Sequence, residues 1–203
     1  MLAALLACIV VYPAIAFSSS MQEPVDSADT SARWLLSYKR DGEGLEFLEK
    51  NTRLRALLEA GLPHYGVPWY RSSQSNWTLP DGVLYAISVL PGSVTVKDNR
   101  FVTITGTAPR EGDLGGLLWC DTAAEQPTLI FVFIEKGLGK AEGSARLNIY
   151  RNGDHTDSPL PRQLVDSVHA WLKGLKIGTL KEATVHDARD QTAPLSTSDL
   201  SPQ

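Results

Sequence analysis

The feature that most constrains the fold is a change of hydrophobic pattern in the middle of the chain. From residue 83 to residue 151 the apolar residues leave helical spacing and form short β-branched and aromatic runs divided by polar turns. Successive strands joined by short turns, with no helix between them, require an antiparallel sheet. Helical spacing appears on both sides of this region. The sequence therefore predicts an α+β fold, with N-terminal and C-terminal helices packed against a central antiparallel β-sheet.

The expected strands alternate between apolar and polar positions. In the third of them Val102 and Ile104 point to one face, while Thr103 and Thr105 point to the other. The run at residues 128–136 is the most apolar and is expected to be the buried central strand. Residues 97–100 form a turn, and the Gly115–Gly116 pair indicates a bulge or a close approach of another backbone. The expected strands cover residues 83–89, 94–96, 101–105, 114–121, 128–136 and 145–152.

Helical spacing predicts three helices. A short one covers residues 31–41, and an amphipathic stretch at residues 44–63, with a second start near residues 51–52, ends at Gly61 and Pro63. The third covers residues 158–175, begins near Pro161, and buries a stripe formed by Leu164, Val165, Val168, Trp171, Leu172 and Leu175.

The connection at residues 64–82 is rich in Tyr, Trp and Pro. Large aromatic rings contribute much apolar area, so a loop pinned to the core is expected. An aromatic binding surface is the alternative, because Trp and Tyr are favoured at interfaces.

Length and charge limit the class of protein. The chain has 203 residues, which fits one domain with tails, and its net charge is −4 with dispersed lysines and arginines. The basic stripe needed for nucleic-acid binding is missing, so we expect no nucleic-acid partner. The predicted organisation is a flexible linker at residues 17–30, one domain at 31–180 and a disordered tail at 181–203, where apolar residues become fewer.

The first sixteen residues are uncharged and nearly all apolar. They are too short to span a membrane comfortably, which takes roughly 20 residues. Ala14 and Ala16 form a small-x-small cleavage signature, so residues 1–16 are interpreted as a signal peptide of a periplasmic protein, cut before Phe17. Two alternatives stay open: an uncleaved inner-membrane anchor, and a lipoprotein attached at Cys8.

No residues form a recognisable catalytic or metal-binding motif. Signal cleavage leaves Cys120 as the single cysteine, and its apolar neighbours favour a packed hydrophobic side chain over a nucleophile. His169, beside the buried stripe, is interpreted as a half-buried surface histidine. We therefore expect no enzyme, no cofactor and no metal. The remaining candidate groups for catalysis are scattered on turns: Asp113, Asp121, His155 and Asp157.

A polar loop at residues 107–113 separates two of the predicted strands. The structural interpretation is a hairpin tip, in which proline and glycine shape the turn and charges keep it solvated. The functional interpretation is that Arg110, following the rigid Pro109, enters a partner's cleft. A guanidinium clamps carboxylates well, and enzymes that cut cell-wall glycans commonly present paired carboxylates in a groove. The candidate partner-binding residues are Thr107, Ala108, Pro109, Arg110, Glu111, Gly112 and Asp113.

Two segments of the chain resemble a known family. LRALLEAGLP (residues 54–63) and KDNRFVTITGTAPREGDLGGLLWCD (97–121) follow an export signal in the order found in the Ivy family, the periplasmic inhibitors of vertebrate lysozyme. In that family the loop runs Cys-Lys-Pro-His-Asp-Cys, its disulfide stiffens it, and its histidine enters the lysozyme active site. The matching positions here are residues 107–112, which keep Pro109, have an acid at Glu111, lack both cysteines and place Arg110 at the histidine position.

The resemblance implies an Ivy-like α+β fold and a partner that is a lysozyme or another peptidoglycan hydrolase. The loop would block the target's cleft, with Arg110 as anchor and Glu111 and Asp113 as a polar rim. Two alternatives remain: a structural or accessory periplasmic protein that keeps the fold without the inhibition, and an immunity protein against a peptidoglycan-targeting toxin. A homodimer also stays open. An enzyme should show a pocket that gathers a histidine with two acids, whereas an inhibitor should show a protruding loop.

Overall fold

A computed structural model describes residues 32–37, 52–66, 77–88, 90–107, 114–136, 144–153, 156, 158–177 and 179–200. The predicted signal peptide (1–16) and linker (17–30) lie outside these ranges. The elements, in chain order, are η1 (Arg33–Ser37), α1 (Thr52–Gly61), α2 (Leu79–Ser88), β1 (Leu90–Lys97), β2 (Phe101–Thr107), β3 (Leu114–Asp121), β4 (Thr128–Lys136), β5 (Ser144–Arg151), α3 (Arg162–Gly174), β6 (Thr179–His186), β7 (Thr192–Pro194) and η3 (Thr197–Asp199).

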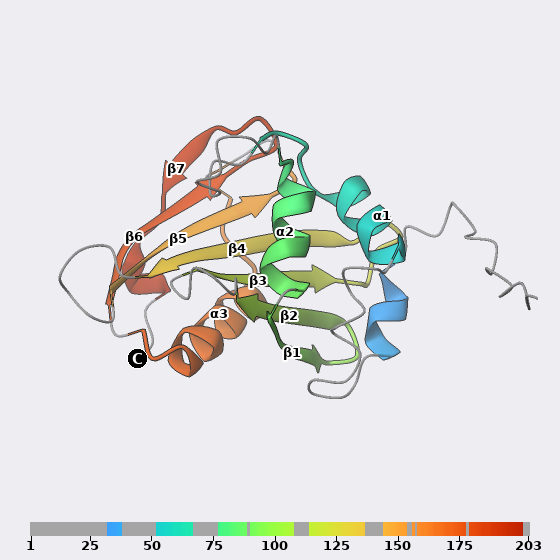
Figure 1. The fold of residues 1–203 in the computed structure, drawn as a ribbon, viewed down its shortest axis with the longest axis horizontal. Coiled ribbons are helices and arrows are strands. Elements are labelled where there is room, and N and C mark those ends of the chain that lie inside the picture. The colour runs from blue at the N-terminus through green and yellow to red at the C-terminus, as the bar shows by residue number, and fades with distance from the viewer. Residues whose placement is uncertain are drawn as a thin grey trace, which may run out of the picture.

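The strands form one seven-stranded sheet in the order β1-β2-β3-β4-β5-β6-β7 (Figure 1). Neighbouring strands are antiparallel except β5 and β6, which are parallel. Parallel neighbours need a crossover connection, and α3 lies in the chain between these two strands. The predicted α+β class is therefore confirmed. The sheet, predicted to be antiparallel, is mostly so and is parallel at the β5–β6 pair.

The strand predicted at residues 83–89 is wrong, because most of this segment belongs to helix α2 (Leu79–Ser88). Its start carries a reciprocal cap: the Asp81 carboxylate accepts hydrogen bonds from the Thr78 N–H at 3.3 Å and the Thr78 hydroxyl at 2.8 Å, and the Asp81 N–H donates to Thr78 Oγ1 at 3.4 Å. The helix is buried over most of its surface. An apolar run of this kind does not distinguish a strand from a buried helix, so the apparent alternation misled the prediction.

Two glycines, Gly106 in β2 and Gly116 in β3, let α2 lie directly on the sheet. They are opposite each other in the antiparallel register. A Cβ on Gly106 would lie 2.6 Å from the Ala86 carbonyl oxygen, and one on Gly116 would lie 2.7 Å from the Ala86 Cβ. Of the bulge or close approach expected at the Gly115–Gly116 pair, the structure shows a close approach, which at Gly116 is made by the Ala86 side chain.

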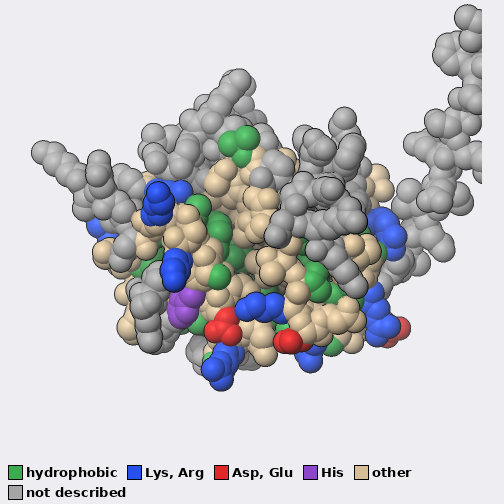
Figure 2. All heavy atoms as spheres, turned by 90° about the horizontal axis from the view of Figure 1, so that it is seen from below, with side chains coloured by type: hydrophobic (Ala, Val, Ile, Leu, Met, Phe, Trp, Pro, Cys, Tyr) green, Lys and Arg blue, Asp and Glu red, His purple; other side chains and the backbone are tan. Residues whose placement is uncertain are grey.

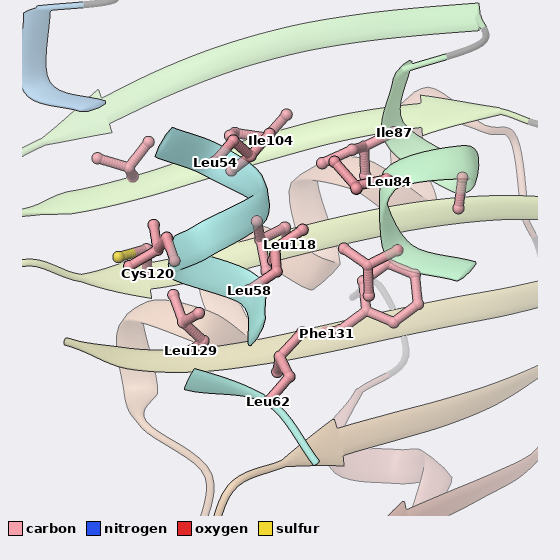
Figure 3. Close-up of a cluster of buried hydrophobic side chains, with 14 of the residues drawn as sticks. Leu54, Leu58, Leu62, Leu84, Ile87, Ile104, Leu118, Cys120, Leu129 and Phe131 are labelled. Carbon is pink, nitrogen blue, oxygen red and sulfur yellow. The ribbon is translucent and has the colours of Figure 1, made fainter. Parts of the chain in front are cut away.

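Each face of the sheet carries its own hydrophobic cluster. On β4, Leu129, Phe131 and Phe133 belong to the cluster with α1 and α2, whereas Ile130, Val132 and Ile134 belong to the cluster with α3. Figure 3 shows the first cluster: leucines of α1 and residues of α2 point toward side chains of β2, β3 and β4. The second cluster takes Leu164, Val168 and Leu172 from α3, which are part of the predicted stripe.

The tail predicted to be disordered at residues 181–203 instead contains most of β6, all of β7 and η3, and this prediction is wrong as far as residue 200. Leu180, Ala183, Val185 and Leu200 are buried in the cluster beneath α3. A strand that buries one face and pairs its backbone with a neighbour needs few apolar residues, so the scarcity of apolar residues in this segment did not indicate disorder. Residues 201–203 lie outside the described ranges.

The other predicted strands correspond to β1 through β5, and the last predicted helix corresponds to α3. The turn between β1 and β2 is confirmed: its central residues Asp98 and Asn99 have left-handed φ values of 54° and 49°, and the Arg100 N–H donates to the Lys97 carbonyl at 3.0 Å. None of the helices in the described residues is long and apolar enough to cross a membrane.

Candidate functional site

The predicted loop begins at Thr107, the last residue of β2, which is paired with Gly115 of β3. The other candidate residues, Ala108, Pro109, Arg110, Glu111, Gly112 and Asp113, lie outside the described residues. Every residue of β2 is paired with β3, from Phe101 opposite Asp121 to Thr107 opposite Gly115. The segment therefore connects two directly adjacent strand ends, as the sequence predicted.

A groove of about 460 Å³ lies beside the base of this hairpin. The side chains of β1 and β2 form its floor, and one face of α3 forms its wall through Ser167, Ala170, Trp171 and Gly174. These four positions follow the spacing of three and four that places residues on one side of a helix. The volume falls in the range of about 300–1,000 Å³ typical of ligand sites.

The groove exists because α3 covers only part of its face of the sheet. The cluster beneath α3 includes residues of β3, β4, β5 and β6, but Phe101 is its single buried member from β1 and β2 among the described residues. Where α3 approaches β2, the Thr103 hydroxyl donates to Ser167 Oγ at 3.1 Å. The uncovered part of the β1–β2 face is consequently open and rich in hydroxyl groups.

One end of the groove is apolar and adjoins the hairpin. Leu90, Thr107 and Gly115 lie in one row across β1, β2 and β3. A Cβ on Gly115 would lie 3.2 Å from Cζ2 of Trp171, so the glycine gives the indole room over this row. Leu90 is 48% exposed, although large apolar side chains elsewhere in the described ranges are mostly covered. An indole and an exposed leucine thus flank the base of the predicted loop.

The opposite end carries a positive charge. Lys97 lines the groove. Within the described part of the chain, no acidic residue lines it and the lysine has no ion-pair partner. The Thr105 hydroxyl accepts a hydrogen bond from the Ser93 N–H at 2.9 Å. The hydroxyls of Thr95 and Thr107 make no hydrogen bond to another described residue. Their donor and acceptor capacity is therefore available to a ligand.

Of the four groups considered for catalysis on sequence grounds, Asp121 lies in the described residues and is held in an ion pair. Arg100 donates to both carboxylate oxygens of Asp121, at 2.7 and 2.6 Å, and these hydrogen bonds hold the pKa of Asp121 below its ordinary value. Burial raises the pKa of the Cys120 thiol to about 12, so Cys120 is a packed neutral side chain, as expected. Asp113, His155 and Asp157 lie outside the described residues.

Sequence reasoning missed a polar cluster at the carboxyl ends of β5 and β6. His186 Nδ1 lies 3.1 Å from Asp190 Oδ1, its Nε2 lies 3.2 Å from Asn148 Oδ1, and its ring stacks on Tyr150 with centroids 4.4 Å apart. Nearby, the ring of Tyr65 lies 6.4 Å from that of Tyr150, and burial raises the pKa of Tyr65. The signal was present as His and Asp residues four apart at 186 and 190, but it lay in a segment expected to be disordered.

The polar side chains of this cluster bond to one another and to the backbone, which is typical of a structural role. Both ring nitrogens of His186 are already engaged, which leaves neither free for a substrate. The adjacent Asp187 is 1% exposed, and its Oδ1 accepts hydrogen bonds from the N–H groups of Arg189 and Gln191, both at 2.8 Å, which fixes the turn between β6 and β7. In the described ranges, no group of three or more His, Cys, Asp or Glu residues is arranged to hold a metal ion.

Comparison of this chain with protein-family models, with curated proteins and with solved structures gives no match.

Proposed function

We propose that this protein is an exported binding module that inhibits a lysozyme-type cell-wall hydrolase by placing the 107–113 loop in the target's active-site cleft. The observation that carries the proposal is the β2–β3 hairpin, which is fully paired up to the first residue of the loop. Arg110 remains the expected anchor, because its guanidinium suits the paired carboxylates of such enzymes.

A rigid hairpin base supports this role. α2 packs against it through Gly106 and Gly116, and the Arg100–Asp121 ion pair joins its far end. Binding costs less when the binding element is ordered beforehand. In the resembling family a disulfide stiffens the loop. Here the packing of the hairpin against α2 would keep the base of the loop ordered instead.

The surface beside the hairpin also supports a protein partner. Leu90 and Trp171 adjoin the first residue of the loop, and aromatic and apolar side chains around a projecting element are common anchors of interfaces. The proposal includes an Ivy-like arrangement in which N-terminal and C-terminal helices pack against the sheet, and the two hydrophobic clusters are consistent with it. It also includes a periplasmic location after cleavage before Phe17.

The test is an inhibition assay with residues 17–203 and a panel of C-type, G-type and bacterial lysozymes. The lysis rate and complex formation are measured for the unchanged protein and for Arg110→Ala and Glu111→Ala. Arg162→Ala is the matched control, since Arg162 is exposed at the first position of α3, away from the groove end that adjoins the loop. Inhibition that is lost with Arg110→Ala and kept with Arg162→Ala supports the proposal. Absence of inhibition against the whole panel overturns it.

A further inference from the structure

The groove between the β1–β2 face and α3 has an extended shape. Its lining runs along β1 from Leu90 to Lys97, which corresponds to roughly 20 Å at about 3.3 Å per strand residue. The cavity volume of about 460 Å³ is spread over this length. A long, shallow ligand therefore fits the groove better than a compact one.

The groove floor is the face of β1 and β2 and offers their side chains, whereas the outer edge of β1 is a separate surface, because β1 is the edge strand of the sheet. β1 and β2 are paired with each other, with Thr95 opposite Thr103, so their facing N–H and C=O groups are already used. A peptide that binds by adding a strand needs an unpaired edge. The floor is consequently unsuited to that form of peptide recognition.

Hydroxyl groups dominate the polar part of the floor. Thr95, Thr105 and Thr107 line it, and a hydroxyl group both donates and accepts hydrogen bonds. The hydroxyl groups of a sugar have the same dual character. The Thr95 and Thr107 hydroxyls have no partner among the described residues, so they are free to exchange hydrogen bonds with such a ligand.

Trp171 and Lys97 add two further elements of recognition. The indole of Trp171 supplies a broad apolar surface on which the C–H face of a pyranose ring can stack. Among the described residues of the lining, Lys97 supplies the single charge and favours a ligand that carries a carboxylate. Figure 2 views the molecule from the side of β1 and α3, and shows uncharged and hydrophobic atoms across the middle, with charged side chains at both sides and toward the lower border.

We propose that this groove binds a short acidic oligosaccharide, with a sugar ring on Trp171, sugar hydroxyls on the threonines of β1 and β2, and a carboxylate at Lys97. This site shares Trp171 with the surface beside the loop, but glycan binding is argued from the groove lining and does not require that the loop blocks a hydrolase. An exported protein with this groove would contact the glycan strands of the cell wall directly.

The experiment is a calorimetric titration of the chain of residues 17–203 with two tetrasaccharides of equal length. One alternates N-acetylglucosamine with N-acetylmuramic acid, which carries carboxylates, and the other is neutral chitotetraose. We expect the acidic ligand to bind about tenfold more tightly at low salt, because a charge-assisted contact is stronger than a neutral one. The preference should shrink as salt is added.

Variants separate the two elements of recognition. Lys97→Gln should abolish the preference for the acidic ligand, and Trp171→Ala should weaken both ligands about tenfold or more. Lys173→Gln is the matched control, because Lys173 is exposed on α3 but does not line the groove. Circular dichroism and thermal unfolding show whether each variant is folded. If Trp171→Ala does not fold, Lys97→Gln still tests the site, because Lys97 is exposed and its replacement removes no buried contact.

Two results would overturn the inference: neither tetrasaccharide binds the folded protein, or binding occurs with no change in Lys97→Gln and Trp171→Ala. The assay contains no hydrolase, so its outcome is independent of the inhibition assay. Glycan binding without lysozyme inhibition would overturn the proposed function and keep this site. Lysozyme inhibition without glycan binding would keep the proposed function and overturn this site.

Discussion

The indole of Trp171 lies over the backbone of Gly115, with its Cζ2 atom 3.2 Å from the position where a Cβ would stand. This contact joins α3 to the strand that leaves the predicted loop. It places an aromatic ring at the groove end next to Thr107, the partner of Gly115 in the sheet.

Gly115→Ala is therefore expected to displace Trp171. The added methyl would also lie 3.0 Å from Ile134 Cγ2, and overpacking of this kind costs about 1–3 kcal/mol of unfolding free energy. Urea unfolding followed by tryptophan fluorescence measures the loss. Gly174→Ala is the control, since a Cβ there meets no atom within 4 Å and the change should be neutral or stabilising by up to about 1 kcal/mol. Equal losses in both variants would contradict the proposed contact.

Gly106→Ala should be more damaging than Gly115→Ala. Its Cβ would lie 2.6 Å from both the Ala86 carbonyl oxygen and the Ile87 Cα, and backbone atoms cannot rotate away as a side chain can. We expect a loss at or above the upper end of the usual range for overpacking, about 3 kcal/mol. Denaturant unfolding tests the order of the two variants. A smaller loss for Gly106→Ala would show that α2 moves easily on the sheet.

Cys120 should be unreactive in the folded protein. Because burial raises its pKa to about 12, roughly one thiol in ten thousand is ionised at pH 8, and the thiolate is the reactive form. A colorimetric thiol reagent should react at once in denaturant and very slowly without it. Burial of the neutral thiol also makes stability depend on pH. The stabilisation that it contributes is complete below the ordinary cysteine pKa and is lost as pH rises toward 12. Fast labelling of the native protein would contradict the burial.

Asp121→Asn should have an effect that depends on pH. Hydrogen bonds from Arg100 lower the pKa of Asp121, so the stabilisation is present above the ordinary aspartate pKa and is lost as pH falls through the lowered value. The Arg100 side chain is half exposed, so we expect a loss of about 1 kcal/mol or less at pH 7. Thermal unfolding at pH 7 and near pH 2.5 tests this, and a difference between variant and parent that grows in acid would contradict it.

Asp187→Ala should loosen the C-terminal strands. The buried carboxylate accepts two backbone hydrogen bonds across the β6–β7 turn, and leaving those N–H groups unpaired costs about 2–4 kcal/mol in total. Asp187→Asn keeps an oxygen acceptor and should lose less. Hydrogen exchange at residues 183–195 measures the local effect. Unchanged protection in Asp187→Ala would show that the turn is held by other contacts.

The candidate site was predictable only in part. The β2–β3 hairpin was readable, because two apolar runs, at residues 101–105 and 114–121, flank a polar segment. The groove beside it was not, since its lining joins β1 and β2 to a helix about seventy residues later in the chain. The loop proposal and the groove proposal therefore rest on different grounds, one on local sequence and one on packing.

Elements whose signals are local could be predicted from the order of the residues alone. The left-handed turn at Asp98–Asn99, the start of α3 after Pro161 and its buried stripe depend on neighbours within a few residues. Tertiary structure decided the elements whose sequences fit more than one state. Residues 83–88 form a helix because the glycines at 106 and 116 leave room for one, and β6 is ordered because β5 supplies its backbone partners. Both outcomes depend on contacts between distant segments, which hydrophobic periodicity does not record.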